Sequence, residues 1–186
     1  MSAPEEVVDL CTACIASVNA TVGVELDFSP DTLSLLDHYA KEVIESSEEE
    51  ILALIAPMAG AYFGEVLCRH FNGRWHAPKD EHAEWRVELE PVFLFVNPVG
   101  VALDVILDAE GPYPSAIRVH EEDMKRVEEA LKVYGDVRES DYFRFSVRFE
   151  ALEQAVSALA RRSNEPGNFT HADYESFLAE QAKKAN

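Results

Sequence analysis

The chain has 186 residues, of which 47% are hydrophobic, and its 35 acidic and 16 basic residues give a net charge of −19 at neutral pH. This length suits one domain, and the apolar fraction suffices for a core, which argues against global disorder. So negative a chain repels phosphate backbones and anionic lipids, which argues against nucleic-acid or membrane binding. We expect one domain over 1–186: an acidic helical part (1–72), a sheet-containing part (73–110) and a helical part (115–186).

The first residues, 4–22, carry apolar side chains at three- and four-residue spacing and predict an amphipathic helix, with Gly23 as its stop. Residues 24–28 alternate apolar and acidic side chains, which fits a short strand or an extended linker. Ser29 is the expected cap of a second helix that has Pro30 at its first position. Its predicted buried stripe is Leu33, Leu36, Tyr39, Ala40, Val43 and Ile44.

A third helix is predicted from a capping-box pattern at Ser47 and Glu50 to about Phe71. Its strongly apolar middle indicates a central position, and Pro57 predicts a kink or a break near Ala56. Residues 74–96 are then rich in aromatic and β-branched types, which predicts a small antiparallel sheet. Residues 86–90 alternate cleanly, so one face of that strand is expected to contact water, while residues 91–96 are continuously apolar and expected to be buried.

Helices are expected again beyond the sheet. Asn97 and Pro98 predict the start of a helix over 98–107, residues 111–114 form a loop, and 120–134 reads as an amphipathic helix that ends at Gly135. Residues 142–149 fit a strand or a helix, and we prefer a helix through about residue 162, because its apolar spacing continues further. A turn-rich break at 164–168 precedes a short terminal helix that begins at Thr170, with Tyr174, Phe177 and Leu178 inward. The predicted fold class is α+β, with several amphipathic helices packed around a small antiparallel sheet.

The three cysteines, Cys11, Cys14 and Cys68, do not suggest a disulfide framework. Cys11 and Cys14 have redox spacing, but both fall on the apolar face of a predicted helix, where cysteine acts as a small hydrophobe. The first residues lack the features of a signal peptide, and no apolar run approaches the ~20 residues that cross a bilayer. We therefore expect a cytoplasmic protein.

A metal site could be imagined from Cys68, His70, His76 and His82, alone or with Cys11 and Cys14. The spacing of Cys68 and His70 is too tight for a usual zinc hairpin, so we expect surface histidines, no metal and no cofactor.

Two further features lie in the third helix. Gly60 and Gly64 form a small-xxx-small pattern, which predicts close helix packing. Glu65 follows at once near the buried surface, and Arg69 is four residues on, so a structural ion pair is expected. The alternative is a general acid or base that works with His70 or His76.

The segment Gly60-Ala61-Tyr62-Phe63-Gly64-Glu65-Val66, followed by Gly73-Arg74-Trp75 and later by Asn97-Pro98, resembles a bacterial domain family of unknown function. The resemblance covers about residues 45–110. It implies an α+β fold and no established activity. Some small acidic bacterial proteins of similar architecture look like immunity or adaptor proteins, which is an analogy of fold.

The acidic excess is concentrated near the start, because residues 1–50 hold 12 acidic residues and one basic residue and so carry −11. Such charge attracts a basic partner and speeds association; the alternative is that it serves only solubility. We expect a protein that binds a basic protein partner and is not an enzyme. The most specific form of this expectation is an immunity-type inhibitor of a basic toxin, and the alternative is an intracellular adaptor or regulatory protein with a non-toxin partner. The sequence leaves the oligomeric state open. The candidate partner-binding residues are Glu25, Asp27, Asp31, Asp37, Glu45, Glu48 and Glu49, with Trp75, Trp85 and Tyr113 as aromatic anchors.

Overall fold

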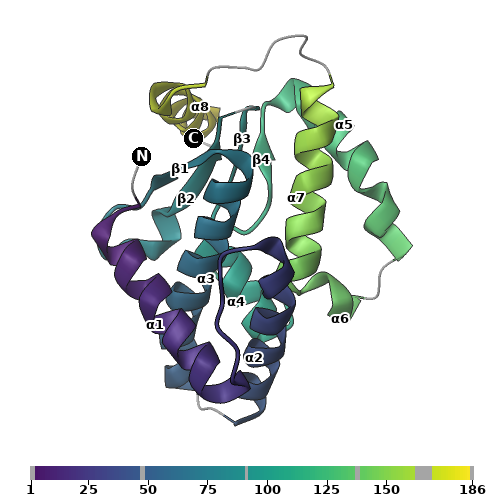
Figure 1. Ribbon diagram of the computed structural model, residues 1–186. Coiled ribbons are helices and arrows are strands. Elements are labelled where there is room, and N and C mark those ends of the chain that lie inside the picture. The colour runs from purple at the N-terminus through teal and green to yellow at the C-terminus, as the bar shows by residue number, and fades with distance from the viewer. Residues whose placement is uncertain (1–2, 47–48, 91, 137–138, 162–168, 185–186) are drawn as a thin grey trace.

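The computed structural model describes residues 3–46, 49–90, 92–136, 139–161 and 169–184; of 43–46, 49–53, 134, 136, 139 and 140 only the backbone is described. A small antiparallel sheet lies between one helix, α8, and a larger helical layer that contains α1, α2, α3 and α4 (Figure 1). The predicted α+β fold is confirmed. The main hydrophobic cluster runs from Cys14 to Leu159 and so draws on all three predicted parts of the chain.

Helix α1 spans Glu5–Val22 and buries Val7, Cys11, Cys14 and Val18, as its spacing predicts. It ends at Gly23, whose φ of 76° lets its amide bond back to the Asn19 carbonyl. Residues 24–28 form no strand, so the linker alternative is correct. A 3-10 turn at Pro30–Thr32 then leads into α2, Leu33–Ser46. The Ser29 side chain makes no capping hydrogen bond, contrary to prediction.

Within α2, Leu33, Leu36, Tyr39 and Ala40 are buried as predicted. The side chains of 43 and 44, and the capping box at 47–50, lie outside the described residues. Helix α3, Glu49–Phe71, continues through Pro57, so of the two predicted alternatives, a kink or a break, the break is excluded. It packs chiefly against α4 and α1 and forms the centre of the helical layer.

The two glycines of α3 permit this close packing. A Cβ atom on Gly60 would lie 2.7 Å from Cα of Val99 in α4, and one on Gly64 would lie 2.2 Å from the Trp75 ring. The predicted role of the small-xxx-small pattern in helix packing is therefore confirmed.

The sheet has the order β1-β2-β3-β4 with antiparallel neighbours. Its strands are β1 (Gly73–His76), β2 (Arg86–Leu89), β3 (Leu94–Val96) and β4 (Arg118–Val119), and a 3-10 turn at His82–Glu84 precedes β2. The first three lie within the predicted region, whereas β4 was not expected. The predicted wet face of β2 is wrong, because Arg86 and Glu88 are buried with 5% and 0% of their surface exposed.

Helix α4, Pro98–Leu107, begins as predicted, because Oδ1 of Asn97 accepts hydrogen bonds from the amides of Val99 and Gly100, both at 2.9 Å. Helix α5, Glu121–Leu131, is followed by a 3-10 turn at Lys132–Asp136. Of the apolar side chains that make the predicted helix over 120–134 amphipathic, Val127 is buried, whereas Met124 and Val133 are 49% and 70% exposed, so this prediction is only partly correct.

The preference for helix near 142–149 is confirmed from Phe145 onward. Helix α6 spans Glu139–Tyr142, α7 spans Phe145–Ala160 and α8 spans His171–Lys184. Tyr174 and Phe177 face inward as predicted, with Leu178 partly buried. The predicted turn at 164–168 lies outside the described residues.

Helix α8 covers the face of β2 that the sequence pattern assigns to water. The Tyr174 hydroxyl donates to the Leu89 carbonyl at 2.7 Å, and its ring stacks on Phe93. The alternating pattern of residues 86–90 marks an ionic face rather than a solvated one.

Gly60→Ala should lower the free energy of unfolding by about 1–3 kcal/mol, because the added methyl meets the backbone of α4 and neither helix yields easily. Urea unfolding followed by circular dichroism measures this. Gly135→Ala is the matched control, since nothing lies within 4 Å of its added Cβ atom. Equal stabilities for the two variants would contradict the close α3–α4 contact.

Asp37→Ala should lower the free energy of unfolding by about 1–3 kcal/mol, because the buried carboxylate accepts the Phe145 amide at 2.6 Å and the Ser146 hydroxyl at 2.6 Å. These bonds fasten the start of α7 to α2. The same urea titration on Asp31→Ala, an exposed aspartate, should show a change within about 0.5 kcal/mol.

Candidate functional site

The connection between α1 and α2 brings three of the predicted partner-binding carboxylates to the surface. Glu25, Asp27 and Asp31 are all exposed. Oδ1 of Asp27 accepts the Ser29 amide at 2.8 Å, and hydrogen bonds from Ser29 lower the pKa of Asp27 below its ordinary value. Asp27 is therefore held in a turn that favours its ionised form.

Phe28 anchors this connection to α3. Its φ of 64° is unusual for a residue other than glycine. The Phe28 amide donates to the Tyr62 hydroxyl at 2.8 Å, the two rings stack with centroids 4.9 Å apart, and the Arg69 guanidinium lies 3.7 Å from the Phe28 centroid. These contacts hold a backbone conformation that would otherwise be costly.

A hollow of about 250 Å³ opens between α1, Phe28 and α3. Most of its lining is apolar, and Val8, one of the lining residues, is 50% exposed. Its lining residues are Ala3, Val7, Val8, Cys11, Thr12, Ile15, Phe28, Glu65 and Arg69. The acidic connection and this hollow together form the candidate binding site.

Glu65 lies in this lining and is already paired. Nε of Arg69 donates to Oε1 at 2.9 Å, and Nε1 of Trp75 donates to Oε2 at 3.2 Å. The predicted Glu65–Arg69 ion pair is confirmed. No histidine is among the described residues that line the hollow, so Glu65 lacks there the partner that the acid–base alternative requires.

The other predicted partner-binding residues do not join this site. Asp37 is buried and caps α7, so it cannot form part of an acidic surface. Trp85 is 1% exposed, and its Nε1 donates to the Pro78 carbonyl, so it belongs to the core. Trp75 and Tyr113 are half-buried and pack against the cluster that contains Trp85. The side chains of 45, 48 and 49 lie outside the described residues.

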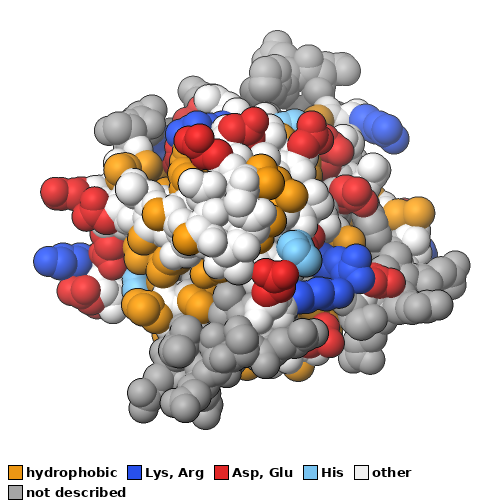
Figure 2. Space-filling model, turned by 60° about the horizontal axis from the view of Figure 1, so that its bottom comes forward, with side chains coloured by type: hydrophobic (Ala, Val, Ile, Leu, Met, Phe, Trp, Pro, Cys, Tyr) orange, Lys and Arg blue, Asp and Glu red, His pale blue; other side chains and the backbone are white. Residues whose placement is uncertain are grey.

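The carboxylates on the face seen in Figure 2 do not form a continuous patch. Red side chains are separated by white and orange ones, and apolar side chains gather nearer the middle. The acidic face expected over residues 25–50 is thus reduced, among the described side chains, to Glu25, Asp27, Asp31 and Glu42.

The cysteines form no reactive pair. Burial raises the pKa of Cys11 and of Cys14 to about 12, and the thiolate is the reactive form of cysteine. All three cysteines are free.

The histidines considered as metal ligands in the sequence do not come together, since His70 pairs with Glu153 and His82 pairs with Glu6. His76 instead meets two residues of α8.

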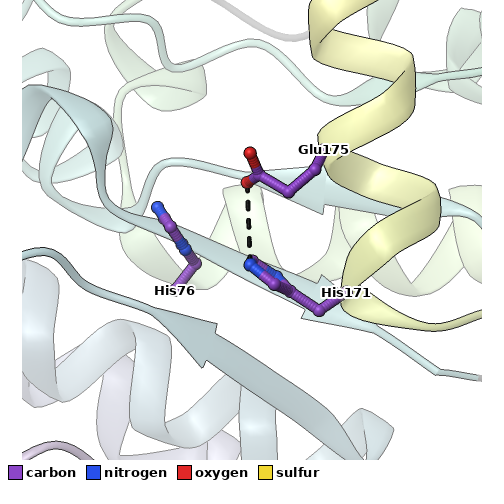
Figure 3. A group of neighbouring side chains, drawn as sticks. All are labelled: His76, His171 and Glu175. Carbon is purple, nitrogen blue, oxygen red and sulfur yellow. Dashed lines mark ion pairs between the residues drawn. The ribbon is translucent and has the colours of Figure 1, made fainter.

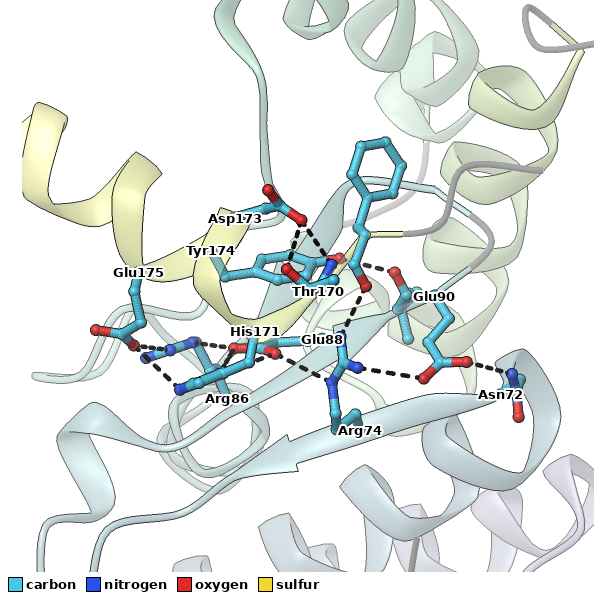
Figure 4. A network of polar contacts seen from close by, with 12 residues as sticks. Asn72, Arg74, Arg86, Glu88, Glu90, Thr170, His171, Asp173, Tyr174 and Glu175 are labelled. Atoms are coloured by element: carbon cyan, nitrogen blue, oxygen red, sulfur yellow. Dashed lines mark hydrogen bonds and ion pairs between the residues drawn. The ribbon is translucent and has the colours of Figure 1, made fainter. Parts of the chain in front are cut away.

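A second polar group lies between β2 and α8 (Figure 4). At its centre Glu88 is fully buried and contacts Nε of Arg86 at 2.9 Å, Nε of Arg74 at 3.4 Å and Nδ1 of His171 at 2.9 Å. Arg74 also reaches Glu90 at 3.4 Å.

The outer edge of this network holds His76, His171 and Glu175 (Figure 3). Arg86 donates to Glu175, and that bond is the main cause of the lowered pKa of Glu175. One ligand atom from each of His76, His171 and Glu175 lies within 4.8 Å of the others, so the set could hold a metal ion.

Sequence reasoning considered His76 but missed His171 and Glu175. Their spacing of four residues on one helix is the only local signal, and it does not show that α8 covers β1 and β2.

No protein-family model matches the sequence, and no match was found among curated proteins or solved structures. The resemblance to a bacterial family therefore stays a prediction. Within the described part of the chain, no helix combines the length and the apolar character needed to span a bilayer.

Iodoacetamide at pH 8 should leave Cys11 and Cys14 unmodified in the folded protein and modify them in denaturant, because burial disfavours their thiolates. Peptide mass spectrometry measures the modified fractions. Rapid alkylation of both residues in the folded protein would mean that the α1–α3 contact is open.

Proposed function

We propose that the protein binds a basic protein partner through the α1–α2 connection and the adjoining hollow. The observation that carries the proposal is the adjacency of an apolar hollow and exposed carboxylates, since Phe28 lines the hollow and Glu25, Asp27 and Asp31 lie on the same connection. An apolar centre with a charged rim is the usual anatomy of an interface.

Charge supports a basic partner. Several arginines are already paired with carboxylates within the fold: Arg69 with Glu65, Arg74 and Arg86 with Glu88, and Arg148 with Asp104. Their charge is therefore offset inside the molecule, and the first 50 residues have one basic residue, Lys41, against 12 acidic ones. Long-range attraction would speed the encounter with a cationic protein.

The hollow supplies the anchor. Val8, Ile15 and Phe28 offer apolar surface. Both oxygens of Glu65 are occupied, so an apolar side chain of the partner fits better than a cationic one. Basic residues around that side chain would then meet Glu25 and Asp31.

The sharpest form of the proposal is an immunity-type protein that occludes a basic toxin, for example a nuclease. The alternative is an adaptor or regulatory protein with a non-toxin partner. The resemblance of residues 45–110 and the acidic charge suit both. Production of the captured partner alone separates them: growth arrest that this protein relieves supports immunity, and normal growth supports an adaptor.

Glu25→Lys combined with Asp31→Lys should weaken the complex roughly tenfold or more at low ionic strength and much less at high salt, because the rim acts through screened charge. The partner is first captured from the native cell and identified by mass spectrometry, and the purified pair is then titrated by calorimetry. Glu128→Lys with Glu129→Lys on α5 is the control, since both glutamates are exposed and the change in net charge is the same. Equal affinity for the two double variants would refute the proposed site.

Val8→Glu tests the hollow in the same titration. It should weaken binding roughly tenfold at any salt concentration, because it places a charge where an apolar contact is expected. Leu107→Glu is the matched control, since Leu107 is 46% exposed against 50% for Val8. If Val8→Glu binds like the control, the partner does not use the hollow.

A further inference from the structure

We infer that His76, His171 and Glu175 form a binding site for a divalent transition-metal ion, with Zn²⁺ as the expected occupant. The inference is independent of the proposed protein interface, because it uses β1, β2 and α8 and none of the residues of the hollow. Two imidazoles and a carboxylate are ligands that zinc takes in proteins.

The fold brings the three side chains together from two elements. His76 ends β1, while His171 and Glu175 are one turn apart on α8 and point toward the strand (Figure 3). The rings of His76 and His171 stack with centroids 5.0 Å apart, and one ligand atom from each of the three residues lies within 4.8 Å of the others. At zinc–nitrogen distances of about 2.0–2.1 Å, ligand atoms of a tetrahedral site lie roughly 3.3 Å apart. Binding therefore requires the ligand atoms to approach by about 1.5 Å at most. It also requires one imidazole to rotate out of the stack, because a metal ion lies in the plane of each ring that ligates it.

The buried carboxylate of Glu88 orients His171. Its oxygens lie 2.9 and 3.2 Å from Nδ1 of His171 (Figure 4). A carboxylate accepts hydrogen bonds, so Nδ1 carries a proton, and in the neutral ring Nε2 then has the lone pair that a metal ion needs. Nε2 is 3.7 Å from Oε1 of Glu175 and so lies on the side of the other two ligands. Carboxylate–histidine–metal chains of this kind are common in metal sites.

The local charge favours a cation. Arg74 and Arg86 face the carboxylates of Glu88, Glu90 and Glu175, which leaves one net negative charge when both histidines are neutral.

Arg86 competes with the metal for Glu175, because its Nη2 already contacts Oε1 of that residue. The competition is limited, since the carboxylate has a second oxygen and Arg86 keeps its bond to Glu88 at 2.9 Å. The side chains of His171 and Glu175 are 48% and 51% exposed, so both can move and water can complete the coordination. Three protein ligands and an open position distinguish this site from a closed structural zinc site.

The test is titration of the metal-free full-length protein with Zn²⁺ by calorimetry and with Co²⁺ by visible absorption. We expect one strong site per chain and Co²⁺ bands of a four- or five-coordinate ion. His76→Ala and His171→Ala should each weaken Zn²⁺ binding at least tenfold, and Glu175→Gln should weaken it too. His70→Ala is the matched control, because His70 is also a half-exposed histidine paired with a glutamate, Glu153. Wild-type affinity in His76→Ala and His171→Ala would overturn the site, as would equal losses in His70→Ala.

The positioning role of Glu88 has a separate readout. Glu88→Gln should lower the affinity for Zn²⁺ by about 10–100-fold. Since Glu88 also pairs with two arginines, this variant could fail to fold. Nitrogen-15 spectra of the histidine rings in the wild-type protein then decide. A neutral His171 that carries its proton on Nδ1 supports the role, and a proton on Nε2 overturns it.

Discussion

The burial of Glu88 is the constraint on which the sheet side of this protein depends. A carboxylate with none of its surface exposed is stable only if charged partners and hydrogen bonds replace its water. Arg86 comes from the same strand, Arg74 from β1 and His171 from α8, so satisfying one charge fixes two strands and the last helix. Removing any one partner would leave charge inside the protein, which explains why charged partners from three elements surround Glu88.

The helical layer is organised by close packing instead of charge. Gly60 and Gly64 let α3 approach α4 and the Trp75 ring, and Tyr62 between them reaches out to hold Phe28 and Thr32. Through these contacts one helix positions both the acidic connection and the floor of the hollow. Glu65 and Arg69 form an ion pair one turn apart on α3, at the wall of the hollow. Glu65 also accepts a hydrogen bond from Trp75, which ties β1 to this wall. The proposed protein-binding site is thus a product of α3 and its neighbours.

The two proposed sites rest on different physics. The hollow offers apolar surface beside screened charge, so its partner would be chosen by shape and by charge sign. The histidine cluster offers oriented lone pairs backed by a buried carboxylate, so its ligand would be chosen by coordination chemistry. They share no residue, and Trp75 and His76, adjacent in β1, turn to opposite networks because side chains alternate along a strand. Strand β1 therefore contacts the wall of the hollow through the bond from Trp75 to Glu65, and it contributes His76 to the histidine cluster.

The sequence by itself determined the elements that local chemistry specifies. These include the apolar stripe of α1, the stop at Gly23, the Asn97–Pro98 start of α4, the Glu65–Arg69 pair and the α+β class. The local elements among these depend on residues a few positions apart. The concentration of acid in residues 1–50 is a matter of composition and is read directly from the sequence. Only the tertiary structure decided that Arg86 and Glu88 face α8 rather than water, that Asp37 caps α7 more than 100 residues away, and that His76 meets His171 and Glu175. The physical reason is that hydropathy patterns report the polarity of a face, whereas its neighbour depends on which distant segment packs against it.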